Sequence, residues 1–210
     1  MSNFTLNKAI INPNSNKRFV VVDDFYENPD YVRDFALETE KHAGGLGRGF
    51  MGNRTPDRYF APKMKEVFEN ILGMKINNWY DGEYCNGVFQ YCVEGDHIVY
   101  HCDGQDWAGA IYLTPDAPFN SGTSFYASTR NRQRGGRGVN FDFDTVFTPE
   151  KDEDPFLNPN LYEKVDEVGN VYNRLVLWDA QLIHAASNYF GNSPYNSRLF
   201  HLFFFNVEGK

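Results

Sequence analysis

The chain has 210 residues, 41% of them hydrophobic and 17% aromatic, with a formal net charge of −8. This length suits a single domain, which we expect to span residues 1–210. The negative charge disfavours non-specific binding to nucleic acid or to an anionic membrane. No apolar run is long enough to span a bilayer, and the first ten residues lack the features of a signal peptide.

The cysteine content indicates a reducing compartment. Cys85, Cys92 and Cys102 are odd in number and lack the spacing of a metal site. We therefore expect reduced thiols and a cytoplasmic location.

The first third of the chain predicts one strand and two helices. Residues 18–23 form a short β-branched run, which is typical of a buried strand. Asn28 followed by Pro29 predicts a capped helix that runs to about His42, and a glycine-rich stretch at residues 44–49 predicts a loop. A second helix begins near Pro62 with one apolar stripe and ends at Gly73. We expect residues 1–80 to supply helical support for a sheet.

From residue 87 onward the pattern becomes that of short strands. The predicted strands are residues 87–93, 97–103, 107–114, 122–127, 175–178, 183–189 and 197–206. A turn at residues 94–96 joins the first two as a hairpin, and residues 191–194 turn between the last two. Helices followed by antiparallel strands predict an α+β fold with a jelly-roll-type barrel over about residues 85–210.

Residues 128–170 interrupt this strand pattern. Four arginines between residues 130 and 137 lie in a glycine-rich stretch, and acidic residues follow at positions 142–154. A long stretch with little regular structure is usually a functional lid or a solvated insertion, and both interpretations stay open.

A His-x-Asp pair and a distant histidine are the candidate metal ligands. On a strand, His101 and Asp103 share one face and Cys102 points away. With His184 they make a set of two imidazoles and one carboxylate, which leaves octahedral positions open and is typical of non-haem Fe(II) oxygenases. A lone His-x-Asp is more often a surface pair. We interpret His97 and His201 as structural or surface residues. His201 is three residues from Arg198 and therefore on the opposite strand face, and His97 lies farther along its strand than His101, nearer the turn.

The order of these residues resembles a known family. Tyr91, His101-Cys102-Asp103, Tyr112-Leu113-Thr114, Gly122-Thr123-Ser124-Phe125, His184 and Arg198 follow one another in the chain. This order resembles the Fe(II)- and 2-oxoglutarate-dependent dioxygenase superfamily, and within it the prolyl-hydroxylase-like branch. The resemblance runs from about residue 88 to the C-terminus and implies a double-stranded β-helix core.

The resemblance also implies a reaction and roles for single residues. His101, Asp103 and His184 would bind Fe(II), and Arg198 would pair with the distal carboxylate of 2-oxoglutarate. Tyr91 and Tyr112 match tyrosines that flank this co-substrate. The implied enzyme is a hydroxylase that consumes dioxygen and releases succinate and CO2. Its organic or peptide substrate stays open, with peptidyl or free proline among the candidates.

Two other functions remain open at this point. A cupin-like barrel would bind a metal through the same ligands without oxygenase activity. A non-enzymatic jelly-roll binding module would leave His101, Asp103 and His184 apart. Arg198 disfavours the cupin-like alternative, because a plain metal barrel has no need for a carboxylate-binding arginine.

Overall fold

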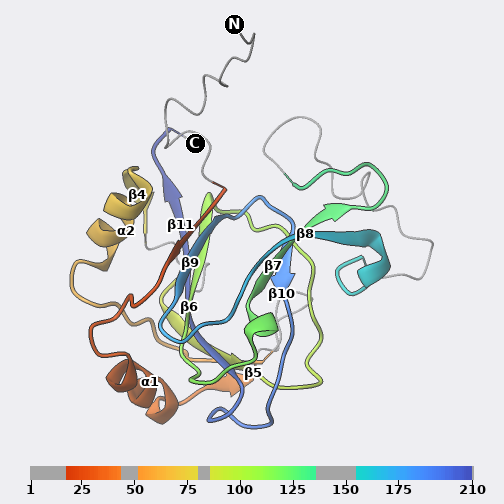
Figure 1. Cartoon of the computed structure of the whole chain (residues 1–210). Coiled ribbons are helices and arrows are strands. Elements are labelled where there is room, and N and C mark those ends of the chain that lie inside the picture. The colour runs from red at the N-terminus through yellow and green to blue at the C-terminus, as the bar shows by residue number, and fades with distance from the viewer. Residues whose placement is uncertain (1–17, 44–51, 80–85, 136–154, 210) are drawn as a thin grey trace, which may run out of the picture.

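The computed structural model describes residues 18–43, 52–79, 86–135 and 155–209, and these are mostly antiparallel sheet with few helices (Figure 1). The elements in chain order are β1 (Phe19–Val22), α1 (Pro29–Glu38), β2 (His42–Ala43), β3 (Asn53–Arg54), α2 (Met64–Leu72), β4 (Ile76–Asn78), β5 (Val88–Cys92), β6 (Trp107–Tyr112), η3 (Phe119–Ser121), β7 (Thr123–Ser128), η4 (Pro159–Leu161), β8 (Tyr162–Val168), β9 (Leu175–Asp179), β10 (His184–Ala186) and β11 (Arg198–Val207). No helix among the described residues is long and apolar enough to cross a bilayer.

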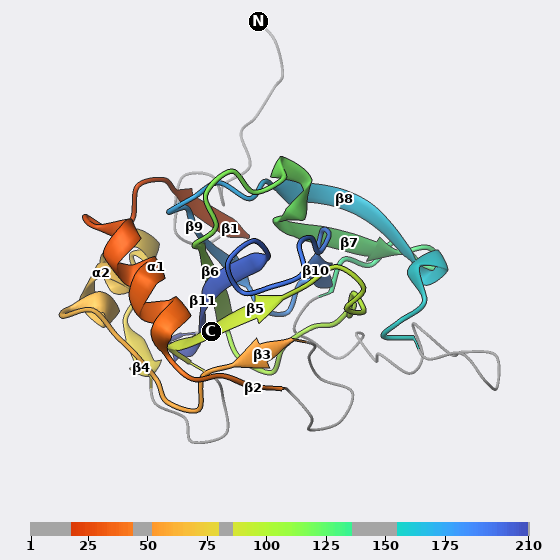
Figure 2. The same ribbon diagram turned by 90° about the horizontal axis from the view of Figure 1, so that it is seen from below.

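The strands form two sheets. The larger has the order β1-β9-β6-β11-β5-β3-β2, with β4 also paired to β11, and the smaller has the order β10-β7-β8. All the pairings of these strands are antiparallel. Figures 1 and 2 show β7, β8 and β10 beside the larger sheet, opposite its helix-covered side.

Side chains of the central strands point alternately to the two faces of the larger sheet, which divides the core into two layers. On β6, Ala108, Ala110 and Tyr112 pack with Phe125 of β7 between the two sheets. The alternate residues of β6, such as Ile111, pack on the other face, beneath the helices. The small side chains of Ala108 and Ala110 leave space between the sheets, which is where a pocket lies.

The first helix begins where the sequence predicts. The Asn28 side chain accepts a hydrogen bond from Tyr31 N–H at 3.3 Å, and Pro29 occupies the first turn, where it has no N–H to satisfy. The helix ends at Glu38 and not near His42, because residues 42–43 form strand β2 instead.

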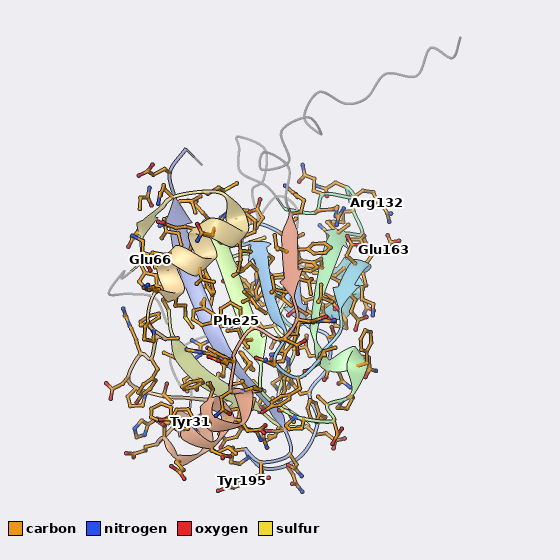
Figure 3. The ribbon with its side chains drawn as sticks, turned by 60° about the vertical axis from the view of Figure 1, so that its left-hand side comes forward. Phe25, Tyr31, Glu66, Arg132, Glu163 and Tyr195 are labelled. Carbon is orange, nitrogen blue, oxygen red and sulfur yellow. The ribbon has the colours of Figure 1, made fainter. Side chains whose placement is uncertain are left out.

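The second helix covers the outer face of the larger sheet. Met64, Phe68 and Leu72 are buried, and the Phe68 ring lies 5.0 Å from that of Phe203 on β11. Burial of a side chain such as Phe68 contributes about 1.5–3 kcal/mol. Gly73 ends the helix with φ at +70°, a conformation that favours glycine. Figure 3 shows Phe25 in the region between this helix and the sheet, and its ring lies 5.8 Å from Phe68.

Several expectations about strands are wrong. Residues 97–103 are extended but form no regular strand, and they make one isolated bridge, between His101 and His184. The predicted hairpin is absent, because β5 pairs with β3 and β11 and not with these residues. Strand β10 is shorter than predicted and pairs with β7, not with β11. Strand β1 is only half-buried, since it lies at the edge of the larger sheet.

The supposed insertion contains a strand. Tyr162–Val168 form β8, which pairs with β7 along its length, so the expectation of little regular structure is wrong there. Arginines from residues 130–135 pair with acidic residues of β8. Arg132 pairs with Glu163 (Figure 3). Arg134 pairs with Asp166. The predicted acidic run at 142–154 and the glycine-rich loop at 44–49 lie outside the described residues, as does Cys85. Cys92 and Cys102 are free thiols.

Candidate active site

The backbone holds the two candidate histidine ligands opposite each other. His101 N–H donates to the carbonyl oxygen of His184 at 3.1 Å, and His184 N–H donates to that of His101 at 2.9 Å. Residues that exchange both hydrogen bonds in an antiparallel bridge have side chains on the same face. The two imidazole rings accordingly lie with their centroids 4.4 Å apart.

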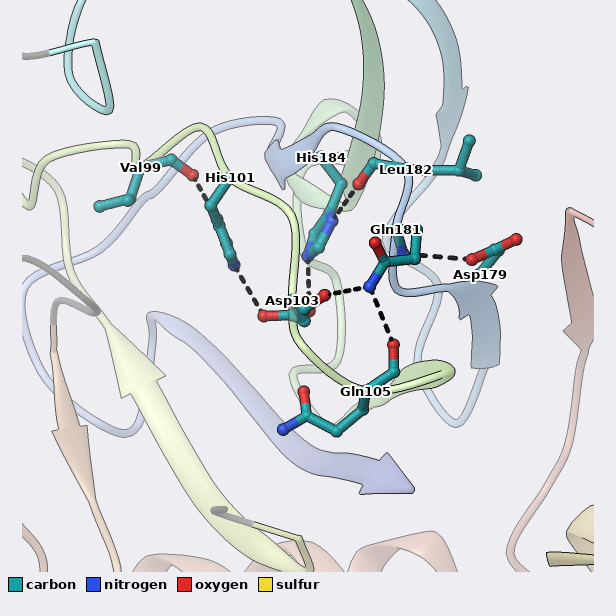
Figure 4. A network of polar contacts seen from close by, with 8 residues as sticks. All are labelled: Val99, His101, Asp103, Gln105, Asp179, Gln181, Leu182 and His184. Atoms are coloured by element: carbon teal, nitrogen blue, oxygen red, sulfur yellow. Dashed lines mark hydrogen bonds and ion pairs between the residues drawn. The ribbon is translucent and has the colours of Figure 1, made fainter. Parts of the chain in front are cut away.

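Asp103 completes the cluster. Two residues along an extended segment return its side chain to the face of His101. Its Oδ1 lies 3.5 Å from His101 Nε2, and its Oδ2 lies 3.3 Å from His184 Nε2 (Figure 4). One ligand atom from each of the three residues lies within 4.8 Å of the others. The structure thus brings together the three residues that the sequence singled out.

Backbone carbonyls fix the protonation of both imidazoles. His101 Nδ1 lies 3.0 Å from the carbonyl oxygen of Val99, and His184 Nδ1 lies 2.8 Å from that of Leu182. A carbonyl oxygen only accepts hydrogen bonds, so each Nδ1 carries a proton and donates it. In the neutral ring, Nε2 then presents a lone pair toward the Asp103 carboxylate. A lone pair and a carboxylate repel each other unless a cation lies between them.

A divalent metal ion fits this arrangement. Asp103 Oδ2 is buried and accepts no hydrogen bond, so it keeps lone pairs for a ligand bond. Ligand atoms bound at right angles, about 2.1 Å from one ion, lie about 3.0 Å apart, close to the two distances above. Two imidazole nitrogens and one carboxylate oxygen are the donor set of non-haem Fe(II) sites. Histidines that bind a metal typically donate their other N–H to a backbone carbonyl, as His101 and His184 do to Val99 and Leu182.

When no metal is bound, protonated imidazoles and the Asp103 carboxylate stabilise each other's charge. Burial alone would raise the pKa of Asp103, but the imidazoles of His101 and His184 outweigh burial and hold that pKa well below its ordinary value. Burial likewise opposes the charged form of His101, but the Asp103 carboxylate raises the pKa of His101 overall. Asp103 is therefore ionised at neutral pH, the state that a metal ligand requires.

Gln181 holds the segment that carries Asp103. Its Nε2 donates to the backbone carbonyl of Asp103 at 2.6 Å and lies 3.4 Å from that of Gln105 (Figure 4). Its own backbone N–H donates to Asp179 Oδ1 at 3.1 Å. Asp103 N–H in turn donates to Ala180 O at 2.8 Å. The turn between β9 and β10 therefore binds both the backbone N–H and the backbone C=O of Asp103.

Arg198 is a buried cation near the cluster. Only 4% of the residue is exposed, and its Nε and Nη2 donate to the carbonyl oxygens of Ser121 at 2.8 Å and Gly122 at 3.1 Å. Its Cζ lies 4.4 Å from the ring centroid of Phe200 and 5.4 Å from that of Tyr112. No carboxylate of the described residues pairs with it. Buried charges are normally paired, so this guanidinium is suited to an anionic ligand.

Arg198 and the two histidines line one pocket. Its volume is about 90 Å³, measured as the space open to the centre of a water molecule. One water needs roughly 10–15 Å³ on this measure, so the pocket has room for a small organic molecule. The remaining lining residues are Arg54, Gln90, Val99, Ala110, Thr123, Trp178, Ala185, Ala186, Tyr189, Phe200, Leu202 and Phe204.

The two predicted tyrosines have different positions. Tyr112 is buried beside Arg198, and its hydroxyl lies 2.8 Å from Thr123 Oγ1, which lines the pocket. Burial raises the pKa of Tyr112, so its hydroxyl is neutral. Tyr91 packs with the core beneath the helices, on the other face of β5. The structure does not bring it to the pocket, and its neighbour Gln90 is there instead.

The other histidines lie away from the cluster. His97 is exposed. His201 is buried on the face of β11 opposite Arg198, with Nδ1 at 2.6 Å from the Tyr26 hydroxyl and Nε2 at 3.0 Å from the Tyr59 carbonyl oxygen. Its placement agrees with strand alternation.

Comparisons by sequence and by structure give different results. No sequence-family model matches the chain, and no curated protein matches it by sequence. Solved structures do match. HygX from Streptomyces hygroscopicus, solved with nickel, 2-oxoglutarate and hygromycin B, has a TM-score of 0.56 at 9% identity, over 97% of this chain and 88% of its own.

Two further structures give similar values. The α-ketoglutarate-dependent carbocyclase SnoK from nogalamycin biosynthesis has a TM-score of 0.55 at 14% identity, over 96% of this chain and 84% of its own. A prolyl-4-hydroxylase from Pseudomonas putida has a TM-score of 0.50 at 12% identity, over 96% of this chain and 99% of its own. At these identities the likeness concerns the fold. The chain therefore has the fold of the iron- and 2-oxoglutarate-dependent oxygenases, whose core is a double-stranded β-helix, as its sequence resemblance predicts.

Proposed function

We propose that this protein is an Fe(II)- and 2-oxoglutarate-dependent oxygenase that hydroxylates an organic substrate. The reaction converts 2-oxoglutarate, dioxygen and a substrate C–H group into succinate, CO2 and a C–OH group. His101, Asp103 and His184 are the proposed iron ligands, Arg198 is the proposed co-substrate ligand, and residues 1–210 act as one domain.

One observation carries this proposal: His101 and His184 of the candidate metal cluster line the same pocket as Arg198, a buried arginine that pairs with no carboxylate of the described residues. A 2-oxo diacid has chemistry for both ends, since its keto acid group chelates a metal and its distal carboxylate pairs with a guanidinium. The neighbours solved with 2-oxoglutarate and with nickel or iron support the same ligands.

The chain's own groups have distinct tasks in this reaction. Bound iron supplies the redox chemistry with dioxygen. His101 and His184 hold each other through two backbone hydrogen bonds, and Gln181 holds Asp103 through a hydrogen bond to its carbonyl oxygen. These bonds keep the proposed ligands in place, so that the remaining metal positions stay open. Arg198 orients the co-substrate, and Tyr112 supports that end of the pocket through Thr123. Apolar side chains such as Phe200 exclude water from the reacting atoms.

The alternative functions are less well supported. The three candidate ligands converge, which is contrary to a binding module in which they stay apart. A cupin-like metal barrel accounts for the cluster but not for the burial of Arg198, which has no acidic partner in the part of the chain that the structure describes.

Two finer assignments belong to the same proposal. We assign α1 and α2 the role of helical support, since Phe35 and Phe68 on these helices contact the rings of Phe89 and Phe203 on the larger sheet. For the substrate, a prolyl hydroxylase neighbour solved with a peptide supports a proline-like group, whereas HygX solved with hygromycin B supports a small molecule.

Binding of 2-oxoglutarate to the Fe(II)-loaded protein without oxygen tests the proposal. Arg198→Met should weaken this binding by about 2–5 kcal/mol, because the distal carboxylate loses its buried partner. Arg198→Lys keeps the charge without the planar fork, so the loss should be smaller. Calorimetry measures both, and His101→Ala should remove the dependence of binding on metal.

Arg174→Met is the matched control. Arg174 pairs with Asp23 and does not line the pocket, so its loss should leave the affinity for 2-oxoglutarate unchanged. An unchanged affinity in Arg198→Met, or equal binding with and without metal, would show that the pocket has another ligand.

A further inference from the structure

Strand β11 runs along the whole length of the pocket. Its residues Arg198, Phe200, Leu202 and Phe204 share one face of the strand, and all four line the pocket. Successive members of this set are about 6.8 Å apart, so the pocket extends from Arg198 at one end to Phe204 at the other. The residues that pair with each of them form rows across the larger sheet, and these rows show how the chemistry of the pocket changes along its length.

Polar side chains gather at the Arg198 end of the pocket. The Arg198 guanidinium lies over the ring of Phe200, with Cζ 4.4 Å from the ring centroid. Gln90 of β5 pairs with Phe200, and Arg54 of β3 pairs with Gln90, so both belong to the same row. This end of the pocket therefore suits the distal carboxylate of the proposed co-substrate.

The opposite end of the pocket is aromatic. Phe204 pairs with Ala108, and Ala108 pairs with Trp178, so one small residue separates two aromatic residues in a row across β11, β6 and β9. Both aromatic residues line the pocket. The neighbouring row adds Leu202 and Ala110 to the lining. None of the lining residues in these two rows carries a charge, a hydroxyl or an amide side chain, so this end is apolar.

The candidate metal cluster belongs to the aromatic end. The His184 ring centroid lies 5.1 Å from that of Trp178, with the two rings at 62°. Phe204 is only partly buried, although it faces the space between the two sheets. The proposed co-substrate reaches from the metal toward Arg198 and occupies the polar end. The substrate then meets the metal at the end that Trp178 and Phe204 border.

An aromatic ring matches this end of the pocket. Aromatic rings attract one another in offset-stacked and edge-to-face arrangements, in addition to the gain from burial of their apolar surface. The rings of Trp178 and Phe204 offer such contacts to a ring that lies beside the metal cluster. A charged or strongly polar group would lose its water at this end and find no hydrogen-bonding side chain in these two rows.

We infer that the substrate of this enzyme carries an aromatic ring and that Trp178 and Phe204 bind this ring beside the metal cluster. This inference rests on the proposed function and names its substrate class. The two side chains set the specificity, because they hold the ring so that a C–H bond on it or next to it faces the open metal positions.

Proton NMR of small probes tests the inference without turnover. The protein is loaded with Mn(II), saturated with 2-oxoglutarate and kept without oxygen, and a second sample carries diamagnetic Zn(II). The aromatic probes are p-cresol and indole, and the polar probes in the same samples are glycerol and N-methylacetamide. Protons that bind near Mn(II) relax faster, and the polar probes report the effect of free Mn(II). At least one aromatic probe should relax faster with Mn(II) than with Zn(II), by more than either polar probe does.

Variants assign the bound ring to the aromatic end. Phe204→Ala should weaken binding of the aromatic probe by about tenfold, since it removes one wall, while the affinities for Mn(II) and 2-oxoglutarate stay unchanged. Phe204→Leu keeps an apolar side chain without the ring. It should retain part of the affinity, and it covers the case in which the alanine variant does not fold. Phe35→Ala is the matched control, because Phe35 is a partly exposed phenylalanine outside the pocket lining, and it should leave probe binding unchanged.

The failures of this inference and of the proposed function are distinguishable. Relaxation of the polar probes that equals that of the aromatic probes, no effect of Mn(II) on either aromatic probe, or full probe affinity in both Phe204 variants would each overturn the inference. A failure to bind 2-oxoglutarate in the loading step would instead overturn the proposed function.

Discussion

Asp103 depends on a residue that is not itself a ligand. The amide of Gln181 binds the backbone carbonyl of Asp103, and the turn that contains Gln181 leads directly into β10, where His184 lies. Gln181 therefore couples the positions of two proposed ligands that are 81 residues apart in the chain. Outer partners of this kind commonly change metal affinity by 10–100-fold.

Gln181→Ala should therefore lower the affinity for Fe(II) or Ni(II) by about tenfold or more, with the fold retained. Competition with a chelator measures this affinity. Gln133→Ala is the control, because Gln133 bonds to Asn131 in a turn that does not line the pocket. Equal metal affinity in Gln181→Ala and the unchanged protein would contradict a positioning role for Gln181.

Single residues show what sequence reasoning could find. The His-x-Asp pair and Arg198 were found because their chemistry is distinctive and strand alternation gives their faces. The same alternation places Gln90 and Tyr91 on opposite faces of β5. Gln90 is a polar residue within the apolar run of this strand, which was a signal that it faces a pocket. Arg54 had no such signal, since a strand of two residues has no periodicity.

At the scale of elements, the junction of η3 and β7 shapes the Arg198 site. A Cβ atom added to Gly122 would lie 1.9 Å from the carbonyl oxygen of Val168 and 2.8 Å from Asn170 N. Only glycine allows the backbone after β8 to approach so closely. The same approach places the carbonyl groups of Ser121 and Gly122 against Arg198.

Gly122→Ala should destabilise the fold and weaken 2-oxoglutarate binding more than metal binding. The clash displaces the two carbonyl groups that orient Arg198, whereas the backbone bonds between His101 and His184 lie elsewhere. Calorimetry with each ligand gives the two affinities, and denaturant unfolding gives the stability.

Gly95→Ala separates stability from site geometry. Gly95 has φ at +92° and open space around it, so alanine strains the backbone there without a clash. It should lower stability and leave both affinities unchanged. If Gly122→Ala lost metal and 2-oxoglutarate affinity equally, the junction would not act through Arg198.

The elements also show where local sequence signals end. The Asn28 cap of α1 and the apolar stripe and Gly73 stop of α2 are local signals, and both helices were predicted from them. The pairing of residues 97–103 was not predicted. The bridge partner of His101 lies 83 residues away, and only the tertiary structure brings the two together. Strand β8 was missed because its charged residues resemble a solvated loop, although Glu163 and Asp166 pair with arginines beside β7.

At the scale of the whole molecule, average charge and local charge differ. The chain has a formal net charge of −8, yet the described residues that line its pocket include two arginines and no acid, with the Asp103 carboxylate held against the two lining histidines. Composition excludes a generally basic surface but says nothing of a small positive cavity inside a negative protein. Such a cavity attracts anions while the rest of the surface repels them, which favours small anionic ligands over polyanions.

Stability should depend on pH through His201, which lies in the core between the larger sheet and the residues around Tyr26 and Tyr59. Burial lowers the pKa of His201 from 6.5 to about 4, while hydrogen bonds that the imidazole makes to the backbone of Gly87 and Tyr59 oppose this shift. The unfolded chain therefore binds a proton at a higher pH than the folded chain does. Stability is unaffected above pH 6.5 and falls as pH decreases toward 4.

Between pH 7 and pH 4.5 this single group should cost about 2 kcal/mol of the free energy of unfolding. His201→Gln has no group to protonate, so its stability, although lower at pH 7, should fall by that much less over the same range. Denaturant unfolding at the two pH values measures the difference. His97→Gln removes an exposed histidine and should keep the full decrease. If His201→Gln lost as much stability on acidification as the unchanged protein, the acid sensitivity of the fold would come from its carboxylates and not from the protonation of the His201 imidazole in the core.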